Sequence, residues 1–274
     1  MRRVIAAFAI LAACPVFAAD TVTWLTSDLP PQYISEGKFA GLGIKDQQLR
    51  LIRGELTEYD HREIQASIGR LWYEMQHEDG VCGIGVLRSP EREKIAVFTE
   101  RPVPVPGFRL IVKTGHLDAF QPFMTPNGEI DLGALKQSRR MTGGYVADRV
   151  YPLPLAEFIA DPGRPGQLER SVGSERLYQL LRSNRVDFVI GLGYEARYFD
   201  SLEEDDAPLT ALPVKGVDRL IKGYTACSDR PLGRTVIARL DALQREDSFW
   251  RQWVAPLQHW LDAADYAAAL RGQP

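Results

Sequence analysis

The chain has 274 residues, of which 45% are hydrophobic and 25% charged, with a formal net charge of −3. This composition supplies a core for one large or two modest domains and excludes a disordered chain. The slight acidic excess excludes the basic footprint of a nucleic-acid-binding protein. Three cysteines and four scattered histidines fit neither a disulfide-framework miniprotein nor a metal-ligand spacing, so we expect no metal and no cofactor.

The amino-terminal segment predicts export. A short basic start is followed by an apolar run over residues 4–13, which is too short to span a membrane as a helix. The small residue Ala18 then ends a signal peptide over residues 1–18. As an alternative, the segment ending at Cys14 resembles a lipoprotein processing box, in which Cys14 is lipidated. Both interpretations place the mature chain outside the cytoplasm, in the periplasm.

Cleavage after Ala18 leaves Cys82 and Cys227 as the cysteines of the mature chain. An even pair in an oxidising compartment is a disulfide candidate. The residues alone leave open whether the two are bridged or are buried free thiols.

The predicted elements of the first half follow from apolar periodicity and from β-branched content. In chain order they are a strand over residues 22–26, a short helix over 44–52, an amphipathic helix over 65–77, a buried strand over 81–87, and strands over 95–98 and 108–112.

The second half alternates in the same way, which predicts an α/β protein. In chain order the sequence predicts a short helix near 132–136, a strand over 140–146, a helix over 153–160, a turn over 161–166, a serine-capped helix over 174–183, a strand over 186–190, an acidic loop over 200–206, a strand over 223–227, and helices over 232–243 and 249–261.

Four segments occur along the chain in a recognisable order. They are Leu29-Pro30-Pro31 with the glycine turn over 37–41, the block over 86–92 with 95–99 after it, the helix-to-strand step over 180–187, and the paired helices after Cys227-Ser228. Together they resemble the type II periplasmic solute-binding proteins, in particular family 3, the group that includes polar amino acid-binding proteins. A narrower resemblance is to a secreted subgroup with cysteines near Cys82 and Cys227.

The resemblance implies two α/β lobes, each a mixed sheet flanked by helices, joined by two crossing strands. The first lobe takes residues 19–107 and 216–274, and the second takes 108–215. The lobes close like a Venus flytrap on a ligand held between them. In this fold Cys82 and Cys227 lie at the same end of antiparallel neighbouring strands, which favours a disulfide.

Arg92 matches the position where family members hold a ligand carboxylate, a task that suits a planar, permanently charged guanidinium. Two departures argue against an ordinary amino acid ligand. Gly85 and Leu87 replace small hydroxyl residues, and Leu192 replaces the acid that holds the ligand ammonium. Glu195 is close enough in sequence to substitute for that acid.

The remaining candidate ligand-binding residues lie at or near strand ends that are expected to face the cleft, where aromatic walls and a few polar groups are typical. They are Tyr33, Tyr145, Trp24, Tyr194, Gly144 and Asp28. Ordinary packing or turn capping is the competing interpretation of each.

The sequence therefore predicts a monomeric solute-binding protein that traps a small anionic or polar ligand for transport or sensing. Its partner is then an ABC permease or a membrane sensor. Neither a nucleophilic triad nor a phosphate-binding loop is recognisable in the sequence, so we do not expect an enzyme. A dehydratase-like activity on the same fold is the less favoured alternative, with Glu195 or an acid near Asp28 as its proton-transfer group.

Overall fold

The structure is a computed structural model, and it describes residues 19–161, 167–202, 208–261 and 263–271. The predicted signal peptide, the alternative lipidation at Cys14, and most of the predicted turn and acidic loop lie outside the described residues. Within the described ranges, none of the helices is long and apolar enough to cross a membrane.

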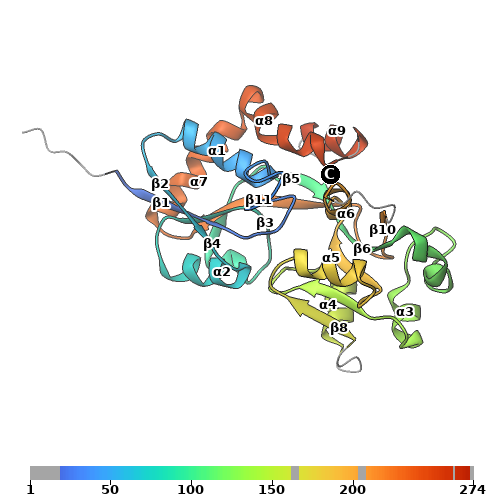
Figure 1. Cartoon of the computed structure of the whole chain (residues 1–274). Coiled ribbons are helices and arrows are strands. Elements are labelled where there is room, and N and C mark those ends of the chain that lie inside the picture. The colour runs from blue at the N-terminus through green and yellow to red at the C-terminus, as the bar shows by residue number, and fades with distance from the viewer. Residues whose placement is uncertain (1–18, 162–166, 203–207, 262, 272–274) are drawn as a thin grey trace, which may run out of the picture.

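The first of two mixed sheets has strand order β2-β1-β3-β11-β4, and β5 also pairs with β11 (Figure 1). Strands β1, β2 and β3 are parallel, whereas β11 runs antiparallel to β3, β4 and β5. Its strands are β1 (Thr21–Thr26), β2 (Asp60–Gln65), β3 (Val81–Leu87), β4 (Ala96–Phe98), β5 (Val103–Pro106) and β11 (Leu220–Ser228).

The second sheet has strand order β10-β6-β9-β7-β8. Strand β7 is parallel to β8 and β9, and β6 is antiparallel to β9 and β10. Its strands are β6 (Phe108–Lys113), β7 (Gly143–Val146), β8 (Leu168–Ser171), β9 (Phe188–Leu192) and β10 (Leu209–Leu212). We call the half of the molecule built on each sheet the first lobe and the second lobe.

Helices cover both sheets. In the first lobe, α1 and α8 lie on one side of the sheet and α2 on the other (Figure 1). The first-lobe helices are α1 (Ile44–Glu55), α2 (Ile68–His77), α7 (Pro231–Gln244), α8 (Asp247–Val254) and α9 (Ala263–Arg271), with the 3-10 helices η1 (Arg92–Lys94) and η3 (Ala255–His259). The second-lobe helices are α3 (Leu132–Ser138), α4 (Leu153–Ala160), α5 (Glu175–Arg182) and α6 (Glu195–Asp200), with the 3-10 helix η2 (Thr114–Phe123).

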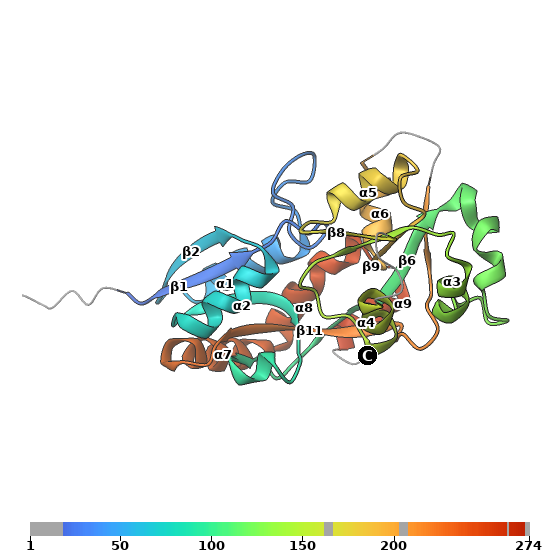
Figure 2. The same ribbon diagram turned by 90° about the horizontal axis from the view of Figure 1, so that it is seen from below.

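The chain crosses between the lobes twice, from β5 to β6 and from β10 to β11, and Figure 2 shows the two lobes side by side around these crossings. The crossing segments touch at Gly107, whose N–H donates to the carbonyl of Arg219 at 2.7 Å. A Cβ at position 107 would lie 2.1 Å from the carbonyl oxygen of Asp218, so this close approach requires glycine. The Arg109 guanidinium reinforces the crossing by donating to the carbonyls of Asp218 and Arg219.

The predicted fold class is confirmed: two mixed sheets flanked by helices and joined by two crossings. Three helix predictions are corrected. The helix expected over 65–77 begins at Ile68, because Gln65 is the last residue of β2. The helix expected over 249–261 ends at Val254 and continues as η3, because Pro256 cannot donate a helical hydrogen bond. Ser174 does precede α5, but its hydroxyl makes no cap hydrogen bond.

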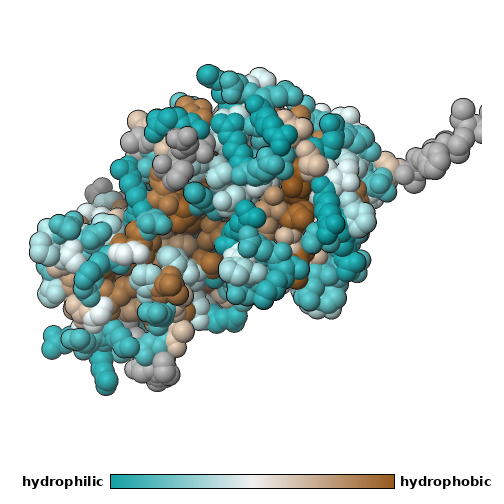
Figure 3. Space-filling model, turned by 180° about the vertical axis from the view of Figure 1, so that it is seen from behind, coloured by the Kyte–Doolittle hydropathy of each residue, from teal (hydrophilic) through white to brown (hydrophobic). Residues whose placement is uncertain are grey.

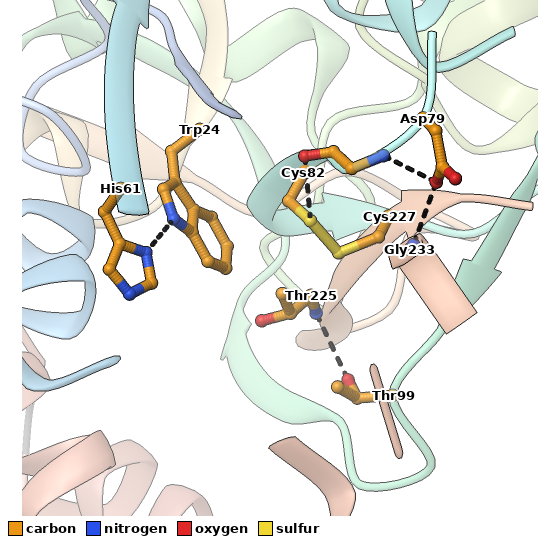
Figure 4. The surroundings of a disulfide bond; sticks show 9 residues. Trp24, His61, Asp79, Cys82, Thr99, Thr225, Cys227 and Gly233 are labelled. Carbon is orange, nitrogen blue, oxygen red and sulfur yellow. Dashed lines mark hydrogen bonds between the residues drawn. A yellow bond between two sulfur atoms is a disulfide. The ribbon is translucent and has the colours of Figure 1, made fainter. Parts of the chain in front are cut away.

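Cys82 and Cys227 face each other across the antiparallel pair β3 and β11 and form a disulfide, as the resemblance implies (Figure 4). Both are fully buried. The bridge joins residues 145 positions apart, and the whole second lobe lies in the loop that it closes. It therefore ties the returning strand to the amino-terminal half of the first sheet.

Replacing both cysteines by alanine is expected to lower the free energy of unfolding by about 2–5 kcal/mol, because a long closed loop is released in the unfolded chain. Urea unfolding of the double variant, beside the oxidised and the reduced natural chain, measures this loss. An unchanged unfolding midpoint, or two titratable thiols in protein purified without reductant, would contradict the bridge.

Candidate ligand-binding cleft

A cavity of about 110 Å³ lies where the two lobes meet. It is outside the carboxyl ends of strands from both sheets, the place where open α/β sheets bind ligands. From the first lobe it is lined by residues that follow β1 and by β3, and from the second lobe by the residues that follow β7 and β9. Most of the cavity wall is apolar. On the face shown in Figure 3, hydrophobic residues gather in a hollow that is flanked by hydrophilic surface.

The charged side chains of this wall are all cations. Lys45, Arg92, Arg101 and Arg149 line the cavity, and no aspartate or glutamate is among the described lining residues. Since burying a charge without a partner is costly, a cavity of this composition favours anions and disfavours ammonium groups. No group of histidine, cysteine and acidic residues suited to a metal ion occurs in the described part of the chain.

Arg92 is held at the entrance of the cavity by contacts with both lobes. Its Nη1 donates to the carbonyl of Leu87 at 2.8 Å, and its Nη2 donates to the carbonyl of Asp148 in the second lobe at 3.2 Å. Its guanidinium also lies 4.1 Å from the centre of the Trp72 ring. Partial burial lowers the pKa of Arg92 to about 10, so the side chain stays charged at neutral pH. Its remaining N–H groups are available to an anion.

Arg149 reaches into the second lobe and pairs with Glu195. The distance from Arg149 Nη2 to Glu195 Oε1 is 2.7 Å, and the two side chains are only 6% and 0% exposed. The Tyr178 hydroxyl donates to the second carboxylate oxygen at 3.1 Å. Burial opposes the charge of Arg149, but the adjacent Glu195 carboxylate raises the pKa of the guanidinium overall. The second terminal nitrogen of the Arg149 guanidinium, Nη1, is buried and has no partner in the described structure.

Tyr33 and Lys45 form the first-lobe wall opposite Arg149. Lys45 lies in the first turn of α1, with its Nζ 5.5 Å from the centre of the Tyr33 ring. Burial, together with the positive charge of Arg149, lowers the pKa of Lys45 to about 7. Burial also raises the pKa of the Tyr33 hydroxyl, so this group stays protonated as a potential donor.

Of the predicted binding residues, the structure brings Arg92, Tyr33 and Tyr194 together at the cavity. The other four do not line it. Trp24 is 1% exposed, and its indole N–H donates to His61 Nδ1 at 3.0 Å (Figure 4).

The remaining three serve local structure. Asp28 accepts a long hydrogen bond of 3.4 Å from the backbone of Ser35. Gly144 faces α5, where a Cβ would lie 2.6 Å from a Leu177 methyl carbon. Tyr145 packs against Tyr151, with 6.3 Å between ring centres.

Glu195, the substitute considered for a lost ammonium anchor, is occupied by Arg149 and Tyr178. Arg149 and Lys45 are the main residues that sequence reasoning missed. Lys45 looks like an ordinary exposed lysine at a helix start, and Arg149 lies in an unpatterned stretch between a strand and a helix. Only the meeting of the two lobes brings them together.

Comparison with known proteins shows the fold. No protein-family model and no curated protein sequence matches the chain.

Solved structures do match the chain. One is a periplasmic binding protein of an arginine transport system from Legionella pneumophila, with a TM-score of 0.62, 14% identity, and coverage of 88% of this chain and 100% of that one. An amino acid ABC transporter substrate-binding protein from Streptococcus pneumoniae, bound to L-arginine, has a TM-score of 0.61, 14% identity and 92% coverage of both chains. The GluR0 ligand-binding core from Nostoc punctiforme, in complex with L-glutamate, has a TM-score of 0.60, 15% identity, and coverage of 88% and 99%. The chain therefore has the two-lobed fold of the periplasmic binding proteins.

Glu195→Gln is expected to lower the free energy of unfolding by about 3–5 kcal/mol, because it leaves the Arg149 cation buried without an anion. The double variant Arg149→Met, Glu195→Gln should recover part of this loss. As a control, Glu100→Gln removes the partner of Arg245 from an exposed pair and should cost less than about 1 kcal/mol. Urea unfolding of the three variants, beside the natural chain, measures each change. Equal losses for Glu195→Gln and Glu100→Gln would show that the buried pair does not carry this energy.

Lys45 is expected to titrate with a midpoint near pH 7, protonated below it and neutral above it, because burial and Arg149 disfavour its charge. Reductive methylation with ¹³C-formaldehyde and NMR detection resolves the lysines, and Lys45→Gln identifies the resonance that disappears. A Lys45 midpoint above 9 would contradict the burial described here.

Proposed function

We propose that this chain is an extracytoplasmic solute-binding protein that traps a small anionic ligand between its two lobes and presents it to an ABC permease or a membrane sensor. The observation that carries the proposal is the charge of the cavity: four cationic side chains, from both lobes, and no acid among the described lining residues. A ligand that bridges the lobes stabilises the closed form in proportion to its contacts with both.

The two-lobed fold supports binding as the function, and the solved structures that share it include the amino acid-binding proteins named above. The signal peptide predicted over residues 1–18 supports a periplasmic location. We place the lobe boundaries at the crossings, with residues 19–107 and 216–274 in the first lobe and 108–215 in the second.

The cavity does not offer a free carboxylate to a ligand ammonium, because Glu195 is already paired. We therefore infer that zwitterionic amino acids bind more weakly than acids of similar size that lack the amine. Arg92 holds the acid at the entrance, with the N–H groups that it does not give to Leu87 and Asp148.

The test is a thermal-shift screen over carboxylates, inorganic phosphate, amino acids and neutral sugars, followed by calorimetry of each hit. Arg92→Gln should lose about 1.5–3 kcal/mol of binding free energy, roughly ten- to a hundredfold in Kd, which is the scale of a charged hydrogen bond. Arg88→Gln is the matched control, because Arg88 is about half exposed and pairs with Glu93 outside the cavity. Stabilisation only by sugars or amines, or equal binding by Arg92→Gln and the natural chain, would refute an anion receptor.

A further inference from the structure

Three hydrogen-bond donors on one part of the cavity wall lack a protein acceptor among the described residues. They are the Tyr33 hydroxyl, the Lys45 ammonium and Arg149 Nη1. Arg149 Nη1 is buried without a partner, and the buried Tyr33 hydroxyl has only the backbone of Ile84 beside it. Lys45 is partly exposed, and its Nζ lies 5.5 Å from the centre of the Tyr33 ring. Tyr33 is 6% exposed, and so is the Arg149 side chain. We call these three residues the Tyr33–Lys45–Arg149 cluster.

The acids near this cluster leave Lys45 without an ion-pair partner. Glu195 accepts from Arg149 at one carboxylate oxygen and from Tyr178 at the other. Asp46, on the same helix as Lys45, accepts from the backbone N–H groups of Ile34 and Gly43, both at 3.0 Å. Glu63, whose charge acts on Tyr33, lies at an exposed position of β2. When Lys45 is protonated, its charge therefore has no ion-pair partner among the described residues.

A buried donor without an acceptor is costly, and a buried cation without an anion is costlier still. A single anionic group placed between the three donors would accept from all of them and balance the excess charge. The cluster therefore has the composition of an anion-binding site.

This cluster is separate from Arg92. Lys45 lies over Gly85 of β3, where an added Cβ would come within 2.5 Å of the lysine Cε and 3.2 Å of its Nζ. Arg92 is bound to the carbonyl of Leu87, two residues further along the same strand. Two strand residues span about 7 Å. The Lys45 ammonium and the Arg92 guanidinium are thus separated by about the length of a short organic molecule. The cavity wall around them is largely apolar and includes Ile68, Leu71 and Val86.

We propose that Tyr33, Lys45 and Arg149 form a second anion subsite, so that the ligand is a small organic acid with two acidic groups joined by a short apolar spacer. One acidic group is held at Arg92 and the other in the Tyr33–Lys45–Arg149 cluster. The proposal rests on the proposed function and specifies its ligand class.

The test compares matched probes by calorimetry: the dicarboxylates succinate, glutarate and adipate against the monocarboxylate pentanoate. The natural chain should bind its best dicarboxylate at least tenfold more tightly than pentanoate. Lys45→Gln should remove this preference by weakening the dicarboxylate at least tenfold while changing pentanoate less than threefold. Lys94→Gln is the matched control, because it makes the same change at an exposed lysine outside the cavity.

Tyr33→Phe keeps the buried ring and removes only the hydroxyl, so it tests the cluster with a smaller risk to folding. It should weaken the dicarboxylate several-fold and leave pentanoate unchanged. Equal binding of both probe types by the natural chain, or an equal loss of both in Lys45→Gln and Tyr33→Phe, would overturn the second subsite while leaving an anion receptor intact. Failure of every carboxylate and of phosphate to bind would instead overturn the proposed function.

Proton uptake is a second readout. The groups that face the Lys45 ammonium are Tyr33 and Arg149, with Glu195 behind Arg149. An anion beside Lys45 raises its pKa above about 7, so binding at pH 8 takes up a proton and binding at pH 6 does not. The dicarboxylate enthalpy at pH 8 should therefore differ between Tris and HEPES buffers, and Lys45→Gln should abolish the difference. Buffer-independent enthalpies in the natural chain at pH 8 would contradict an anion at Lys45.

Discussion

The buried ion pair between Arg149 and Glu195 determines the electrostatic character of the cleft. A carboxylate that is 0% exposed cannot stay ionised in an apolar wall without a cation and donors around it. Arg149 and Tyr178 satisfy both oxygens of Glu195, which removes this acid from any role with an external ammonium group. Because the pair uses only one guanidinium nitrogen, it leaves Arg149 Nη1 for the cavity. The same interaction therefore neutralises the acid and adds a cationic donor to the ligand site.

This ion pair acts at the cleft only because the two crossings hold the lobes face to face. Gly107 allows the outgoing segment to touch the carbonyls of the returning one, and a side chain there would push the crossings apart. The disulfide between Cys82 and Cys227 links the returning strand β11 to β3 of the first sheet. The carboxyl ends of strands from both sheets consequently meet around one cavity.

Much of the fold could be predicted from the sequence, because its buried elements carry clear periodicity. The strand Val81–Leu87 is a continuous apolar run and was predicted with its observed limits. The edge strand Asp60–Gln65 was missed, because four of its six residues are charged or histidine and its side chains are largely exposed. The disulfide followed from the resemblance, since the order of strands in the sheet was needed to bring the two cysteines together.

The site could be predicted only in part. Arg92 and Tyr33, which the sequence singles out because they adjoin recognisable strands and motifs, both line the cavity. Lys45 and Arg149 were missed, because their burial arises from contacts between lobes that no local pattern encodes. Trp24, an aromatic residue near a strand end, does not line this cavity, and its indole N–H donates to His61.

Arg92 also shows how a ligand and closure can be coupled. In this structure it spans the lobes itself, by donating to the carbonyl of Asp148. When Arg92 donates to the Asp148 carbonyl only the donor is charged, whereas when it donates to an anion both partners are charged, so that their Coulomb attraction is larger. An anion in the cleft that accepts from Arg92 therefore makes a stronger interaction than the direct hydrogen bond between the lobes, from Arg92 to the Asp148 carbonyl. If that anion also contacts Arg149 in the second lobe, its binding energy is available only in the closed form. Differential affinity of this kind is what allows a ligand to shift a hinge equilibrium.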